Sequence, residues 1–517
     1  MSQFDSLDWG GLAAVGAMYA AFLVVGARAA RRVQGGPVAG LILAGRDLPL
    51  WVATLTMTAT WVDGGYLLGT AEGVFKPRGG LLLGLQGGIC FGVSLILGGL
   101  FFARTMRARE FTTLVDPFEA RFGKRWAAVL AAPALLGEAI WSAALLAAIA
   151  ATFGVLLRMD RTTAVLLSSA VVTTYTMLGG MWSVAWTDIF QLALVPVGLL
   201  AALPFAMGAA GGWDVCLREY FAMRSAEPAW SFQQTVGWWD VTAMLVLGGI
   251  PWNCYFQRVL SCRSPVVAQR HSILAGLLTI LLTVPPLLLG MAAAGQRWPA
   301  FVQAALADDP SSALPMLLRH AVPYGIGLLG LAAIVGAVTS SFSSSILSAA
   351  SMFGWNIYGQ LIAPRARPAR VTAVVRGSIV LLGAGAAAFA LLVQSVQELW
   401  FFTADLVFVL LVPQLFAALY DPQANRIGSI TAFAVSLVLR LGGGLPLLGL
   451  EPFIPYPELC AAVVPISPGE WYELSPGGVQ AMLFPYKTTA FLAGVLLLPC
   501  VSRLTGRWDP PRPLSGK

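Results

Sequence analysis

Residues 56–66 read Thr-Met-Thr-Ala-Thr-Trp-Val-Asp-Gly-Gly-Tyr, a polar stretch with a glycine pair inside an otherwise apolar segment. A similar stretch, Gly-Gly-Ile-Pro-Trp-Asn, occupies residues 248–253. Glycine loosens a helical backbone and proline removes a ladder hydrogen bond, so both segments are predicted to unwind there. Paired interruptions in corresponding positions of two halves are typical of inverted-repeat transporters, which bind substrate at the break. Ordinary kinked helices are the alternative, because Gly and Pro are common in membrane spans.

The composition around these stretches is that of a membrane protein. The 517 residues are 57% hydrophobic and 11% charged, whereas about a quarter of the residues in a soluble domain are charged. Apolar runs of roughly 20 residues, long enough to cross a hydrocarbon layer of about 30 Å, recur along the whole chain. Runs such as 273–290 and 377–393 do not alternate as barrel strands do, so the predicted fold class is an all-α polytopic membrane protein.

The apolar runs predict about 13 membrane spans in one membrane domain covering residues 1–517. Their centres are predicted near Ala20, Trp61, Phe91, Trp141, Val171, Val195, Leu247, Leu281, Val338, Ala384, Leu410, Val435 and Leu496. Basic loops alternate with sparser ones, which places the N-terminus outside and the C-terminus in the cytoplasm. The net charge of +7 is therefore expected to set topology, with membrane lipid as a partner and no nucleic acid.

Several long motifs resemble one known family. They include Gly45-Arg46-Asp47, residues 56–66, Ser94–Phe102, Asp116-Pro117-Phe118, residues 179–191 and residues 247–260. In these motifs the chain resembles the solute:sodium symporter family, and within it the high-affinity choline transporter branch. The resemblance implies a LeuT-like fold of five plus five inverted repeats.

This fold divides the chain into four parts. The resemblance implies a first repeat over about 49–208 and a second over about 236–420. One extra span with its loop, 1–48, would precede the repeats, and two extra spans with a short tail, 421–517, would follow them.

The function that the resemblance implies is sodium-coupled, chloride-dependent import of choline across the plasma membrane. The alternative is a sodium symporter of the same fold for betaine, another quaternary amine or proline. A zwitterion would call for an arginine or a helix N-terminus facing its carboxylate, and no mid-span arginine occurs near Trp61 or Trp252. Membrane-embedded enzymes form a further class, which is disfavoured because the two histidines, His271 and His320, lie at span ends without a triad or metal-ligand cluster.

Aromatic residues at the breaks are candidates for binding a quaternary ammonium, which donates no hydrogen bond and is recognised by aromatic faces. The family's aromatic positions correspond to Trp61, Trp141, Trp252 and Phe91, and Trp400 is expected to add a wall. The family has Tyr where this chain has Phe91, so this position lacks the ring hydroxyl that would contact the choline hydroxyl. The alternative for any one tryptophan is a role as an interfacial anchor.

A sodium site is predicted beside the first break. Sodium needs hard oxygen ligands, which unwound carbonyls and hydroxyls supply. Ala337, Ser340 and Ser341 share one helix face and match the family's sodium motif. By position in the family pattern, the carbonyls of Thr58 and Trp61 would face them.

Acidic residues inside the spans are the remaining candidates. The choline branch has an acid where this chain has Ser343, and Gly where it has Asp63. We therefore expect Asp63 to supply negative charge near Na⁺ and the substrate; the alternative is that it faces a water-filled outer vestibule. Glu138, Asp188 and Asp405 are expected to pair with polar groups between helices.

Overall fold

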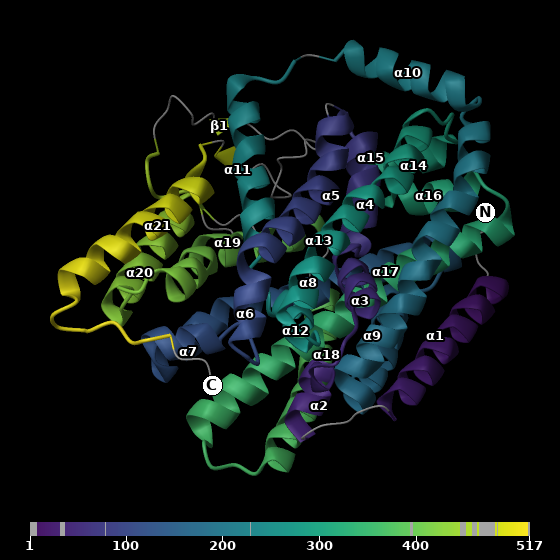
Figure 1. The fold of residues 1–517 in the computed structure, drawn as a ribbon. Coiled ribbons are helices and arrows are strands. Elements are labelled where there is room, and N and C mark those ends of the chain that lie inside the picture. The colour runs from purple at the N-terminus through teal and green to yellow at the C-terminus, as the bar shows by residue number, and fades with distance from the viewer. Residues whose placement is uncertain are drawn as a thin grey trace.

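The structure is a computed structural model that describes residues 8–31, 37–77, 79–227, 229–392, 396–444, 451–456, 463–464, 481–482 and 484–514. Helices make up nearly all of this part of the chain (Figure 1). The helices of its first half are α1 (Trp9–Ala30), α2 (Pro37–Leu43), α3 (Leu50–Trp61), α4 (Gly64–Phe75), α5 (Gly80–Leu97), α6 (Arg104–Ala108), α7 (Asp116–Phe122), α8 (Lys124–Leu157), α9 (Arg161–Ala209) and α10 (Trp213–Ser225). Those of its second half are α11 (Phe232–Gly248), α12 (Asn253–Ser261), α13 (Pro265–Leu281), α14 (Val284–Ala294), α15 (Ala300–Asp308), α16 (Ala313–His320), α17 (Tyr324–Met352), α18 (Pro368–Leu392), α19 (Val396–Tyr420), α20 (Arg426–Gly442) and α21 (Tyr486–Thr505). The two-residue strands β1 (Val463–Val464) and β2 (Ala481–Met482) pair antiparallel.

The helices are apolar and long, as a membrane requires. Within the described residues, 8 helical runs are long and apolar enough to cross a bilayer. Their backbone groups bond within each helix, which lipid demands because it offers no partners. The prediction of an all-α polytopic membrane protein is confirmed.

Every predicted span centre falls within a described helix, although the count of about 13 spans stays a prediction. Two of these centres, Val171 and Val195, lie in the 49-residue helix α9. Its backbone breaks at Gly180, where φ is 52° and ψ is −136°. A β-carbon there would lie 2.2 Å from the Leu41 carbonyl oxygen, so the bend needs glycine.

The two interruptions predicted from the sequence are confirmed. Helix α3 ends at Trp61 and α4 begins at Gly64, with non-helical residues between them. Helix α11 ends at Gly248 and α12 begins at Asn253. The repeat boundaries at 49–208 and 236–420 remain a prediction, but each range contains one of the two breaks.

Helices α8 and α17 form the centre of the molecule, and α1, α20 and α21 lie at its periphery (Figure 1). Helix α17 packs along α8 and α9 and touches the broken helices through α3, α4 and α12. The side chains that α8 and α17 direct inward therefore meet the two breaks in the interior of the protein.

Candidate functional site

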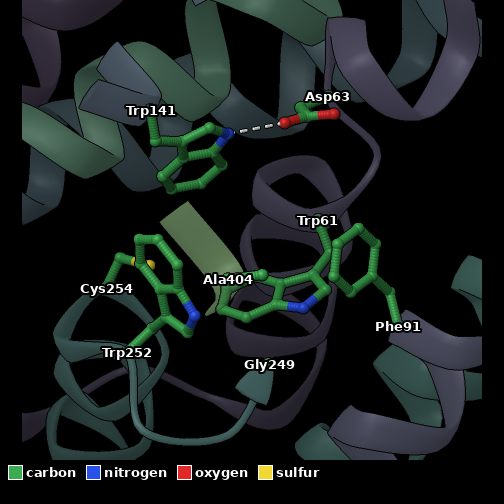
Figure 2. Close-up of a pocket in the computed structure, with 8 residues that line it drawn as sticks. All are labelled: Trp61, Asp63, Phe91, Trp141, Gly249, Trp252, Cys254 and Ala404. Atoms are coloured by element: carbon green, nitrogen blue, oxygen red, sulfur yellow. Dashed lines mark hydrogen bonds between the residues drawn. The ribbon is translucent and has the colours of Figure 1, made fainter. Parts of the chain in front are cut away.

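Four aromatic side chains meet in one cavity between the two breaks. Trp61 ends α3, Trp141 comes from α8, Trp252 lies at the start of α12 and Phe91 comes from α5; all four line the cavity (Figure 2). The rings of Trp141 and Trp252 meet edge to face, with centroids 5.5 Å apart and an interplanar angle of 69°. The structure thus brings together four of the five aromatic residues predicted to bind substrate, and the side chain of Trp400 lies outside the described part.

The second break itself positions Trp252. This residue has extended backbone angles, φ −100° and ψ 134°, at the start of α12. Its indole Nε1 donates to the Gly248 carbonyl over 2.8 Å and so satisfies an acceptor at the end of α11. A β-carbon on Gly248 would lie 2.8 Å from Cβ of Phe408, so glycine allows α11 to approach α19 closely. The unwound backbone and the ring orientation therefore depend on each other.

The first break places a carboxylate in the same cavity. Asp63 is the N-cap of α4, and its Oδ1 accepts from the Tyr66 backbone N–H over 2.6 Å. Its Oδ2 accepts from the Trp141 indole Nε1 over 2.8 Å (Figure 2). Asp63 is 3% exposed and lines the aromatic cavity.

Sequence reasoning missed three other lining residues: Gly249, Cys254 and Ala404. Gly249 and Cys254 belong to the stretch around the second break, which was a usable signal. Ala404 is a small apolar residue on α19, and nothing in the sequence distinguishes it from other alanines in spans. Among the described residues that line the cavity, Asp63 is the charged one.

The predicted sodium-binding serines lie against α3. Ser340 Oγ donates to the Ala59 carbonyl and Ser341 Oγ to the Thr60 carbonyl, each over 2.8 Å. Both hydroxyls also lie within hydrogen-bond distance of the Ala337 carbonyl, at 2.9 Å and 3.2 Å. These hydroxyl and carbonyl oxygens are ligands of the kind that a small hard cation takes.

The carbonyls in this contact differ from the expected pair, Thr58 and Trp61. The Thr58 carbonyl accepts from the Val62 N–H over 2.9 Å, the bond that ends α3. The Thr58 hydroxyl donates to the Thr54 carbonyl of the same helix. The serine hydroxyls thus bond the carbonyls of Ala59 and Thr60, and the roles of Thr58 and Trp61 as sodium ligands stay a prediction.

The other intramembrane acids bond between helices, as expected. Asp188 forms an ion pair of 2.9 Å with Arg258, and both side chains are fully buried. Asp405 pairs with Arg440. Glu138 accepts from Ser345 and Ser348. Ser343 donates to the Ser340 carbonyl and is not among the residues that line the cavity.

Comparisons with known proteins agree with this geometry. The model of the sodium:solute symporter family matches residues 41–435. The high-affinity choline transporter 1 of Caenorhabditis elegans is 38% identical, with 96% of this chain and 88% of the relative covered. The human high affinity choline transporter 1 is 37% identical, with 96% and 85% covered.

Solved structures share the fold at low sequence identity. A Na⁺-coupled sialic acid symporter, in a substrate-bound outward-open state, superposes with a TM-score of 0.75 at 19% identity, covering 96% of this chain and 97% of that one. Mhp1, a transporter of the nucleobase-cation-symport-1 family, gives 0.58 at 13% identity, covering 90% and 95%. These likenesses confirm the predicted LeuT-like fold.

Proposed function

The chain belongs to the sodium:solute symporter family, and from this premise we propose that it imports choline together with Na⁺ across the plasma membrane. The observation that carries the proposal is the aromatic cavity at the two helix breaks, which contains Asp63 and no basic side chain among its described lining residues. A quaternary ammonium is held by ring faces and by a nearby negative charge. The choline transporters of worm and human that this chain resembles over 96% of its length support choline as that cation.

Sodium would bind where Ser340 and Ser341 meet the carbonyls of Ala59 and Thr60. Those carbonyls belong to the last turn of α3, which ends at Trp61, two residues before Asp63. An ion held there would order the break and the aromatic cavity together, so Na⁺ would raise the affinity for the organic cation. Each cation that enters gains about 2.3 kcal/mol per 100 mV of inside-negative potential.

The finer parts of the proposal concern topology and chloride. We propose an outer N-terminus and a cytoplasmic C-terminus, since basic loops favour the cytoplasmic side. Chloride dependence is proposed from the resemblance to the choline branch. Replacing external chloride with gluconate should slow choline uptake. An epitope tag at the N-terminus should be accessible on intact cells, and a tag at the C-terminus only after the cells are permeabilised.

Uptake of radiolabelled choline into proteoliposomes tests the central proposal. Uptake should be saturable, should require external Na⁺ rather than K⁺, and should increase with an inside-negative potential. Trp252→Ala should abolish it, whereas Trp9→Ala, at a tryptophan 74% exposed on α1, should leave it unchanged. Saturable uptake without Na⁺ would contradict the symport proposal, and uptake of betaine but not choline would contradict the substrate.

A further inference from the structure

Buried carboxylates mark places where the protein accepts an electrostatic cost, because a charge away from water needs a partner. Seven acidic residues are buried in the described part: Asp63, Glu72, Asp116, Glu138, Asp188, Asp240 and Asp405. A buried acid that has no basic partner needs a mobile cation to compensate its charge.

Five of the seven lie near a basic side chain. Glu72 pairs with Lys76 at 2.7 Å, Asp188 with Arg258 at 2.9 Å, and Asp405 with Arg440. Asp240 and Asp116 form no ion pair among the described residues, but the charges of Lys487 and Arg46 act on them through space. Asp63 and Glu138 form no ion pair with a basic side chain of the described residues. Asp63 lines the aromatic cavity, and Glu138 accepts from the backbone of Cys254, which also lines it.

Neutral donors bond both oxygens of the Glu138 carboxylate. Its Oε1 accepts from Ser348 Oγ over 2.5 Å and from the Cys254 N–H over 3.3 Å, and its Oε2 accepts from Ser345 Oγ over 2.7 Å. Cys254 is the second residue of α12, so the carboxylate faces the positive end of this half-helix. These groups solvate a negative charge and hold it in place, but they do not neutralise it.

Glu138 lies directly behind the wall of the cavity. Cys254, whose N–H it accepts, lines the cavity. Trp141 follows Glu138 by one helical turn on α8 and donates its indole N–H to Asp63. Trp141 thus bonds the carboxylate of Asp63 and lies one helical turn from Glu138 on α8.

We infer that Glu138 is a second counter-charge of the substrate site, acting through space from behind Cys254. This inference rests on the proposed function. It explains how the binding of Na⁺ is coupled to the binding of the organic cation. With one Na⁺ and one organic cation bound, two monovalent cations balance the two ionised carboxylates of Asp63 and Glu138. Each cation favours the binding of the other, since either one alone leaves a carboxylate uncompensated in a medium of low dielectric constant.

A charge-selective comparison of ligands tests this inference. Glu138→Gln keeps the size of the side chain and removes its charge. The probes are choline and its neutral isostere, in which a quaternary carbon replaces the nitrogen. In Glu138→Gln the dissociation constant of choline should rise about tenfold or more, with a higher half-saturating Na⁺ concentration, while that of the isostere should change less than about twofold. In the unmodified protein, labelled Na⁺ and choline should enter in equal amounts.

Two further variants separate charge from structure. Glu138→Asp retains the charge and should keep the preference for choline over the isostere, even where folding is weakened. Ser345→Ala removes a donor to Glu138 but leaves the carboxylate, and should keep that preference too. Equal weakening of choline and isostere in Glu138→Gln, or entry of two Na⁺ per choline, would overturn the inference.

Failure of the proposed function would look different. In that case the unmodified protein itself would show neither Na⁺-dependent choline uptake nor a preference for choline over the isostere. A protein that transports choline but whose preference is unaffected by Glu138→Gln would overturn the inference and leave the proposed function standing.

Discussion

Asp63 connects two tasks that sequence reasoning treats separately. One carboxylate oxygen caps α4 and the other fixes the indole of Trp141. The residue that starts the second half of the broken span thus also orients a wall of the cavity. A change at Asp63 should alter both the start of α4 and the affinity for a cation.

Asp63→Asn should weaken the binding of choline. The variant keeps the shape of the side chain but removes the only charge among the described lining residues, and the KM for choline should rise at least tenfold, or about 1.4 kcal/mol. Asp160→Asn is the matched control, because Asp160 caps α9 through the Thr163 N–H at an exposed site. Uptake kinetics of both variants measure the effect, and near-normal uptake by Asp63→Asn would contradict it.

Ser340→Ala and Ser341→Ala should each raise the half-saturating Na⁺ concentration roughly tenfold, with a smaller change in maximal choline uptake at saturating Na⁺. Each substitution removes one hydroxyl oxygen and leaves the α3 carbonyls in place. Thr174→Ala serves as the control, since its hydroxyl returns to the Ala170 carbonyl of its own helix. An unchanged Na⁺ dependence in both serine variants would place the sodium site elsewhere.

Single residues show where prediction from the sequence reaches its limit. Trp61 and Trp252 could be found because each adjoins a polar, glycine-containing break. The α3 carbonyls opposite Ser340 could not be placed to the residue, because helix phase depends on how α3 packs against α17. The bond between Asp63 and Trp141 joins residues 78 positions apart and depends on tertiary packing alone.

The first break packs tightly against α17. A β-carbon on Gly64, the first residue of α4, would lie 2.3 Å from Cγ2 of Val338. The φ angle of Gly64 is not positive, so its backbone suits any residue and only space requires glycine. The broken helix therefore packs on α17 directly beside the proposed sodium site.

Gly64→Ala should reduce choline uptake several-fold and destabilise the protein by about 1–3 kcal/mol through overpacking. Val338→Ala removes the clashing methyl group, so the double variant should recover uptake relative to Gly64→Ala. Gly69→Ala on the same helix is the control, as its β-carbon would meet nothing within 4 Å. Thermal denaturation followed by size-exclusion chromatography, together with uptake, checks all four proteins; failure of the double variant to recover would contradict the steric explanation.

At the level of elements, the sequence predicts breaks better than it predicts partners. Gly248, Gly249 and Pro251 indicate an unwound segment from local chemistry alone. That α11 then packs against α19, with Gly248 beside Phe408, follows from the tertiary arrangement. Likewise, the bend at Gly180 could be expected only as a loop between two predicted spans, because its close contact with Leu41 involves a distant segment.

Across the whole molecule, one buried ion pair joins both broken helices to the rest of the bundle. Arg258 of α12 bonds Asp188 of α9, the carbonyl and hydroxyl of Thr56 on α3, and Ser344 of α17. Four helices that are distant in sequence thus meet at one guanidinium, which is fully buried. The motif around Asp188 could be recognised in the sequence, but its partner could not, because the two residues are 70 positions apart.

This pair should behave as a coupled unit in a double-mutant cycle. Asp188→Asn leaves a buried guanidinium uncompensated, and Arg258→Met leaves a buried carboxylate, so each should destabilise the protein by about 3–5 kcal/mol. The double variant contains neither buried charge, and its stability should exceed that expected from adding the two losses by at least about 1.5 kcal/mol. Arg503→Gln, at an ion pair of 3.8 Å in which Arg503 is 55% exposed, should change stability by less than about 0.5 kcal/mol. Thermal and denaturant unfolding of the four proteins provides the cycle. Strictly additive losses would mean that the helices are held by their packing alone, and that the ion pair contributes no coupling between the broken helices and the helices around them.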